Sequence, residues 1–303
     1  MRRGLGRALV VVSLAAIAGW ATAACPPEGM SRNALLAVRN NHWLVDDAAK
    51  REALAMSLVD CLADPDPTLR DEVGFEGLQH WMRANQLAPG TVRRIGDQLL
   101  RRVTRAAVAA DGRGVAAPFA ALTLAEVARI DRLTPLYSAP ERDAIVTAAA
   151  AYLASVRDYR GFDAQEGWRH GVAHGADWLL QLSLNPALDK PQLDRLLDAI
   201  AVQVLPPGES SYIYGEGQRL MAPVFYIAKR GLHDTAFWTS WLGRIAGSAV
   251  PADGQAINAA SLARLHNARE FIWPLYAAVQ ESTDEAQRQR LLPGLKAAVK
   301  ALP

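Results

Sequence analysis

Residues 138–157, SAPERDAIVTAAAAYLASVR, show which class of fold this chain adopts. Ser138 and Glu141 have the spacing of a capping box, and Pro140 stands in the first turn, where its missing N–H is not needed. The apolar residues that follow recur at the three- and four-residue intervals of one helix face. The segment therefore predicts a helix over 140–157.

The same periodicity continues on both sides of this segment. It predicts further helices over 31–44, 46–62, 67–84, 90–110, 118–131, 167–184, 190–205, 214–230, 234–247, 255–266, 269–281 and 284–301. Short segments rich in Pro, Gly and Asp, such as 64–67 and 206–208, separate the helices. No stretch alternates long enough to predict a strand, so the predicted fold is all-α.

Helices joined by short loops pack as antiparallel neighbours, and here successive pairs recur about every 40–45 residues. This pitch predicts a HEAT-like solenoid of helical hairpins. An α/α toroid and a compact orthogonal helical bundle are the alternatives. No linker divides the helices, so residues 25–303 are expected to form a single all-helical domain.

Residues 1–24 have the pattern of a secretory signal peptide. Arg2, Arg3 and Arg7 form a basic region, residues 8–18 form a short apolar one, and residues 21–23 read as an A-x-A cleavage signal. This predicts an exported protein, either periplasmic or secreted. No later segment is apolar over about 18 uninterrupted residues, so the mature chain is expected to have no transmembrane segment.

The formal charge of the chain depends on this leader. The whole chain carries a net charge of +2, and removal of the leader takes away three arginines, which changes it to −1. Basicity confined to a leader does not indicate a nucleic-acid partner.

The chain contains two cysteines, Cys25 and Cys61. In an oxidising compartment they are expected to form a disulfide that ties the mature N-terminus to the second predicted helix. The alternative is a lipid anchor on Cys25, although Thr22-Ala23-Ala24-Cys25 is a poor lipoprotein box because its first residue is not a large aliphatic.

A polar stripe interrupts the apolar pattern in residues 167–180, GWRHGVAHGADWLL. On a helix, His170, His174 and Asp177 would lie within about 60° of one another. Trp168 would lie on the opposite, apolar face. Glycines at 171 and 175 are expected to allow close approach of a neighbouring helix.

Four interpretations of the stripe remain open. Two histidines four residues apart can bind Zn²⁺, with Asp177 as the third ligand, although the glutamate of the H-E-x-x-H motif is missing. Alternatively, His170 or His174 is a general base that Asp177 orients. The same groups could bind a polar ligand, or form a structural hydrogen-bond network. The sequence contains no G-x-S-x-G, P-loop or dinucleotide fingerprint.

Three other polar segments are expected to converge on this stripe if the helices line one concave surface. They contribute Arg70 and Asp71, then Arg160, and finally Glu216 with Arg219. Helix capping and ion pairing are the structural alternatives for each. In the acid–base interpretation, Arg219 would be an electrophilic clamp.

The phrases DPTLRDEVGFEGLQHWM, RDYRGFDAQEGWRHGVAHGADWL and YGEGQRLMAP together resemble an uncharacterised bacterial family, domain-of-unknown-function family 2785. The residues that match its pattern are Arg70, Asp71, Arg160, Gly161, Gly167, Trp168, His170, His174, Gly175, Ala176, Asp177, Glu216 and Arg219. The chain departs from the family's usual R-S-F at 117–119, where it has Ala-Pro-Phe. The resemblance implies a HEAT-like helical fold and no particular activity.

The sequence therefore predicts an exported all-helical protein that binds a polar small molecule, glycan or peptide of the cell envelope. The expected binding residues are His170, His174, Asp177, Glu216 and Arg219, supported by Arg70, Asp71, Arg160, Gly167 and Trp168. A hydrolase or lyase acting on an envelope polymer is one alternative, and a purely structural polar network is another. The sequence specifies neither a cofactor nor an oligomeric state.

Overall fold

The computed structural model describes residues 25–251 and 256–303, and the prediction of an all-α fold is confirmed. The predicted signal peptide, residues 1–24, lies outside the described residues. The described helices are α1 (Arg32–Asn40), α2 (Ala48–Cys61), the π-helix η1 (Thr68–Phe75), α3 (Glu76–Arg83), α4 (Pro89–Arg102), α5 (Arg105–Ala110), α6 (Ala116–Leu133), α7 (Ala139–Ser155), α8 (Gly171–Ser183), α9 (Lys190–Val204), α10 (Glu216–Lys229), α11 (Thr235–Ala249), α12 (Ala259–Gln280) and α13 (Glu285–Ala301).

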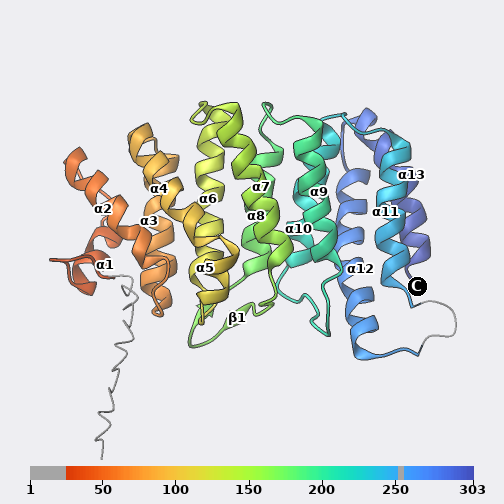
Figure 1. Ribbon diagram of the computed structural model, residues 1–303, viewed down its shortest axis with the longest axis horizontal. Helices are drawn as coiled ribbons and strands as arrows, with labels where there is room; N and C mark the ends of the chain where they lie inside the picture. The colour runs from red at the N-terminus through yellow and green to blue at the C-terminus, as the bar shows by residue number, and fades with distance from the viewer. Residues whose placement is uncertain (1–24, 252–255) are drawn as a thin grey trace, which may run out of the picture.

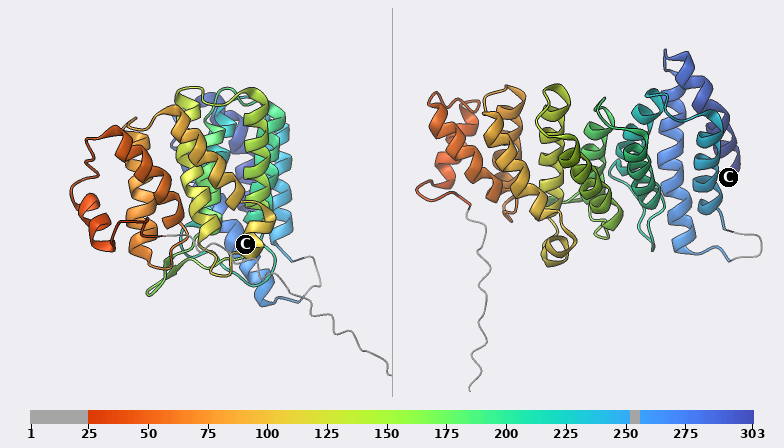
Figure 2. Two further views of the ribbon diagram at one scale, coloured as in Figure 1. Left: turned by 60° about the vertical axis from the view of Figure 1, so that its left-hand side comes forward. Right: turned by 45° about the horizontal axis from the view of Figure 1, so that its top comes forward.

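The helices stand side by side in a row, from α1 and α2 at one end to α11 and α13 at the other (Figure 1). Alternate helices pack on each other: α6 contacts α8, α8 contacts α10, and α10 contacts α12, while α7 contacts α9. A turned view keeps this order and shows an open row (Figure 2, right), unlike the closed ring of the toroid alternative. Membership in the HEAT-like repeat class stays a prediction.

The core runs through the middle of the row, where α8 packs between its neighbours. Trp178 and Leu179 of α8 are fully buried. A Cβ atom added at Gly175 would lie 3.0 Å from Leu153 and 3.1 Å from Tyr152, both on α7. The glycine thus lets α7 and α8 approach closely, as expected from its place beside the polar stripe.

Several predicted helix boundaries are wrong. The segment 90–110 is two helices, because Thr104 caps a new helix by accepting a hydrogen bond of 3.3 Å from the backbone of Ala107. The predicted break at 267–268 does not exist, since α12 is continuous. Its polar residue Asn267 instead bonds a distant loop, accepting from the backbone N–H of Tyr212 at 2.8 Å.

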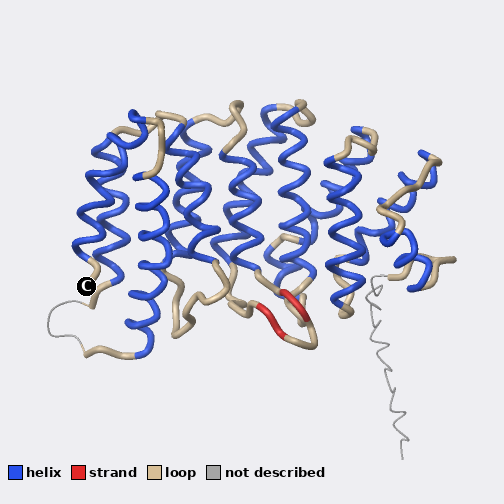
Figure 3. Tube along the Cα trace, turned by 180° about the vertical axis from the view of Figure 1, so that it is seen from behind, coloured by secondary structure: helices blue, strands red, loops and turns tan. Residues whose placement is uncertain are grey.

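Two short antiparallel strands, β1 (Phe162–Asp163) and β2 (Gly167–Trp168), form a hairpin where the sequence predicted no strand. Two residues are too few to give a visible alternation. The turn closes because Oδ1 of Asp163 accepts hydrogen bonds from the backbone N–H groups of Gln165 and Glu166, both 2.8 Å. The hairpin lies among the loops along one edge of the row (Figure 3).

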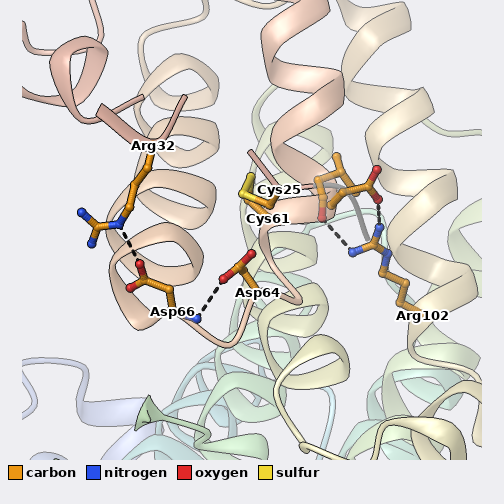
Figure 4. Close-up of a disulfide and its surroundings, with 8 residues drawn as sticks. Cys25, Arg32, Cys61, Asp64, Asp66 and Arg102 are labelled. Carbon is orange, nitrogen blue, oxygen red and sulfur yellow. Dashed lines mark hydrogen bonds and ion pairs between the residues drawn. A yellow bond between two sulfur atoms is a disulfide. The ribbon is translucent and has the colours of Figure 1, made fainter. Parts of the chain in front are cut away.

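Cys25 and Cys61 are joined by a disulfide at the N-terminal end of the row (Figure 4). Cys61 is the last residue of α2 and is fully buried. Nearby, Nε of Arg32 lies 2.8 Å from a carboxylate oxygen of Asp66, which fixes α1 to the loop after α2. No helix within residues 25–251 and 256–303 is long and apolar enough to cross a membrane.

Candidate functional site

Only part of the predicted polar stripe lies on a helix. Helix α8 begins at Gly171, so His170 is not helical but occupies the N-cap position with a left-handed backbone, φ 55°. Trp168 lies on strand β2 and not on the apolar face of a helix. The expectation of one continuous helix over 167–184 is therefore wrong, because the hairpin occupies its first residues.

Arg70 is fully buried and holds the hairpin in place. Its Nη2 atom donates to the carbonyl oxygens of Glu166 at 2.7 Å and Trp168 at 3.3 Å. The guanidinium also lies 4.9 Å from the centre of the Phe119 ring, close enough for a cation–π contact. Arg70 is thus part of the support beneath the candidate site and does not contact solvent.

Asp71 and Gly167 both contact Arg70 and help it to hold the hairpin in place. Oδ1 of Asp71 accepts a hydrogen bond of 2.8 Å from Nε of Arg70, yet burial raises the pKa of Asp71 to about 6. Gly167 has φ +72°, and a Cβ atom there would lie 2.7 Å from Pro67 and 3.0 Å from Arg70. Only glycine combines this backbone conformation with so close an approach.

His170 lies at the centre of the candidate site and is 8% exposed. Its ring stacks on Trp168, with centroids 4.5 Å apart and planes inclined by 21°. Nε2 lies 3.2 Å from the carbonyl oxygen of Tyr214, and because that oxygen only accepts, Nε2 carries the proton. Burial, followed by the charge of Arg219, lowers the pKa of His170 to about 4.

His174 is buried one turn further along α8, at 7% exposure. Its ring packs edge-on against Phe119, with centroids 5.1 Å apart. Within the described chain, its Nδ1 atom has no hydrogen-bond partner. Burial is the largest cause that lowers the pKa of His174 to about 3, so the ring is neutral at physiological pH.

Glu216 is the first residue of α10 and is also buried, at 3% exposure. One carboxylate oxygen accepts a hydrogen bond of 2.9 Å from the backbone of Tyr214, and the other lies 3.8 Å from Nε2 of His170. Burial raises the pKa of Glu216. The carboxylate therefore fixes the loop before α10 next to the imidazole.

Asp177 and Arg219 form an ion pair between α8 and α10. The Asp177 side chain is mostly buried and burial raises its pKa, although the Arg219 charge acts in the opposite direction. Arg219 is 51% exposed. From the sequence, Asp177 was a possible orienter of an imidazole and Arg219 a separate clamp. The structure instead pairs the two with each other.

Arg160 lies in the loop before β1 and is half exposed. Nε donates to Asp158 at 2.8 Å, while Nη2 donates to the carbonyl oxygen of Arg113 at 3.3 Å. These bonds join the loop before the hairpin to the loop before α6. Arg160 thus forms an ion pair with Asp158, and ion pairing was the structural alternative to a binding role.

Three exposed rings, Phe162, Trp168 and Tyr214, gather above His170, and we call them the aromatic surface. They are 49%, 37% and 38% exposed. The Trp168 ring centroid lies 5.1 Å from that of Phe162 and 5.8 Å from that of Tyr214. This cluster was not predicted from the sequence, because Trp168 was placed on a helix. In the structure Trp168 pairs with Phe162 across the hairpin, and Tyr214 comes from a distant loop.

Gly161 is the sequence signal that could have pointed to the cluster. A Cβ atom at this position would overlap the ring of Tyr214, which comes from a loop more than fifty residues later. The glycine therefore lets the ring of Tyr214 lie against the backbone just before β1.

The two most voluminous of the cavities described do not coincide with the predicted site. Cavities of about 620 and 610 Å³ lie elsewhere, beside α5 and beside the start of α11. Among the described residues, no three His, Cys, Asp or Glu side chains gather as a possible metal site. The zinc interpretation thus lacks its third ligand, because Asp177 is engaged by Arg219.

Fold and site together define an all-helical protein whose aromatic surface rests on a buried polar network. The model of a protein family of unknown function (DUF2785) matches residues 115–277, and the chain belongs to this family. The match includes the hairpin, α8 and the start of α10. It does not include Arg70 and Asp71, although their sequence resembles the family pattern. No curated protein and no solved structure matches the chain significantly.

Proposed function

We propose that this chain is an exported protein that binds a glycan of the cell envelope through the aromatic surface and the adjoining Asp177–Arg219 ion pair. The single observation that carries the proposal is the clustering of three exposed rings: Phe162 and Trp168 of the hairpin, and Tyr214 of a distant loop. Large aromatic side chains are usually buried, so an exposed group of them indicates a binding surface.

The chemistry of the surface favours a neutral polar ligand. Aromatic faces pack well against the C–H faces of sugar rings, while polar groups at their edge bond hydroxyls. The Asp177–Arg219 ion pair has no net charge, and its exposed guanidinium, whose charge acts on His170 beneath the rings, offers donors. A surface with donors, acceptors and flat apolar faces suits a glycan better than a strongly charged ligand.

Two observations support export. Residues 1–24 have the composition of a signal peptide. Cys25, the first residue after that segment, is in a disulfide with Cys61, and such bonds persist in oxidising compartments.

Acid–base catalysis has less support than binding. His170 and His174 are each more than nine-tenths buried, and Nε2 of His170 is bonded to a backbone carbonyl. A general base needs access to the proton that it removes. We therefore propose that both imidazoles have a structural role beneath the aromatic surface.

The test is a calorimetric titration of the mature protein with soluble glycan fragments from cell envelopes, in parallel with envelope peptides. We expect saturable glycan binding that Trp168→Ala weakens at least about tenfold. Trp273→Ala is the matched control, because Trp273 is 48% exposed on α12, outside the aromatic surface. Equal binding by both variants, or binding of peptides alone, would contradict the proposal.

A further inference from the structure

An apolar groove separates the junction of α4 and α5 from the C-terminal half of α7. Its volume is about 620 Å³, within the range of about 300–1,000 Å³ typical of small-molecule sites. Its lining residues are Leu100, Val103, Thr104, Arg105, Val108, Ala109, Ala148, Ala151, Tyr152, Ala154, Ser155 and Arg157. None of these residues belongs to the aromatic surface or to its buried support.

The groove exists because small side chains cover one face of α7. Ala148, Ala151 and Ala154 follow one another at three-residue intervals, which places them along one helix face. Facing them, α5 buries none of its residues. Val108 and Ala109 of α5 complete the apolar part of the lining, and no larger side chain of the described chain fills the space.

Two cations border this apolar space. Arg105 and Arg157 line the groove, and none of its lining residues in the described chain is acidic. Arg157 donates from Nη1 to the carbonyl oxygens of Ala154 at 2.9 Å and Val156 at 2.6 Å, and it forms no ion pair with another described residue. Within the described residues, Arg105 forms no ion pair either. The groove thus combines an apolar floor with a net positive edge.

We propose that this groove binds a fatty acid, with the acyl chain along α7 and the carboxylate at Arg105 and Arg157. A long apolar chain with one negative end matches both features of the groove. A neutral lipid would leave the two guanidinium groups without a partner, whereas a small anion would leave the apolar walls in contact with water. This inference does not depend on glycan binding at the aromatic surface.

Calorimetry with laurate, octanoate and the neutral analogue dodecanol tests the proposal on the mature protein. Laurate should bind saturably and more tightly than octanoate, by up to about fourfold for each additional buried methylene. Dodecanol should bind more weakly than laurate, because it lacks the carboxylate. Trp168→Ala should leave laurate binding unchanged, which separates this site from the aromatic surface.

Substitutions test the apolar floor of the groove and its positive edge separately. Ala151→Trp places a large ring in the groove and should weaken laurate binding at least about tenfold. Ala144→Trp is its matched control, because Ala144 is also exposed on α7 but does not line the groove. Replacing Arg105 and Arg157 with Gln should weaken laurate binding by up to about fivefold for each arginine and leave dodecanol binding unchanged.

Three results would overturn the inference. The first is the absence of saturable laurate binding to the wild-type protein. The second is equal binding of laurate by the Ala151→Trp and Ala144→Trp variants. The third is a dimer, detected by sedimentation velocity, that Ala151→Trp dissociates, because a second copy of the chain would then occupy the groove.

Discussion

The guanidinium of Arg70 donates from Nη2 to the carbonyl oxygen of Glu166 at 2.7 Å, across a separation of 96 residues. This bond joins η1 to the hairpin that presents Trp168. Arg70 precedes the region matched by the family model, whereas the hairpin lies inside it. The position of the aromatic surface therefore depends on a part of the chain outside that region.

Arg70→Ala should destabilise the protein. The substitution leaves the carbonyl groups of Glu166 and Trp168 without their buried donor, and it empties a fully buried position. We expect the free energy of unfolding to fall by about 3 kcal/mol or more. Urea denaturation measures this change. Arg101→Ala is the control, because Arg101 is exposed at the end of α4 and should contribute less than about 0.5 kcal/mol. Similar losses in both variants would show that Arg70 does not support the hairpin.

Stability should decrease in acid because of the buried histidines. The pKa of His174 is about 3 in the folded protein, compared with 6.5 for a free imidazole, so the unfolded chain binds more protons between these values. The contribution of His174 to stability is therefore complete above pH 6.5 and is lost as the pH decreases toward 3. His170, with a pKa of about 4, acts in the same direction. Asp71 acts in the opposite direction. Its pKa is about 6 in the folded protein, so the folded state binds its proton more readily than the unfolded state and gains stability as the pH decreases.

His174→Gln isolates one of these groups. Between pH 6 and pH 4.5, the slope of the unfolding free energy against pH should decrease by up to about 1.4 kcal/mol per pH unit, which corresponds to one proton. Urea denaturation at several pH values gives this slope. An unchanged slope in His174→Gln would mean that His174 is accessible to protons in the folded protein.

The disulfide between Cys25 and Cys61 should contribute to stability. Replacing both cysteines with Ser should lower the free energy of unfolding by about 3–4 kcal/mol, as the chain-entropy model gives for a loop of this length. Dithiothreitol should destabilise the wild-type protein but not the variant. Mass spectrometry and N-terminal sequencing of the exported chain test the accompanying expectation that the leader is removed. An acylated Cys25 in the membrane fraction would instead support the lipid-anchor alternative.

Much of the fold could be predicted because helices have local signals. The capping box at Ser138 and Glu141 begins α7 in the structure, as the sequence indicates. The predicted break in α12 failed for a tertiary reason, since the side chain of Asn267 interrupts the apolar pattern in order to bond a distant loop. Other boundaries failed for local reasons, such as the cap at Thr104 that divides α4 from α5.

The sequence indicated which polar residues would lie near one another around α8, but not how they are paired or which of them are exposed. His170, His174, Asp177, Glu216 and Arg219 do lie on adjoining elements, yet most of them are buried or paired with each other. The three rings of the aromatic surface come from positions whose local sequence does not show that they meet.

The sequence by itself determined the helical class, the positions of most helix starts and the polar residues grouped around α8, because capping and apolar periodicity act over a few neighbouring residues. Only the tertiary structure decided which groups face solvent. That choice arises from contacts between distant segments, such as Gly161 with Tyr214 and Arg70 with the hairpin. Burial depends on all the elements that surround a side chain, and no local pattern contains that information.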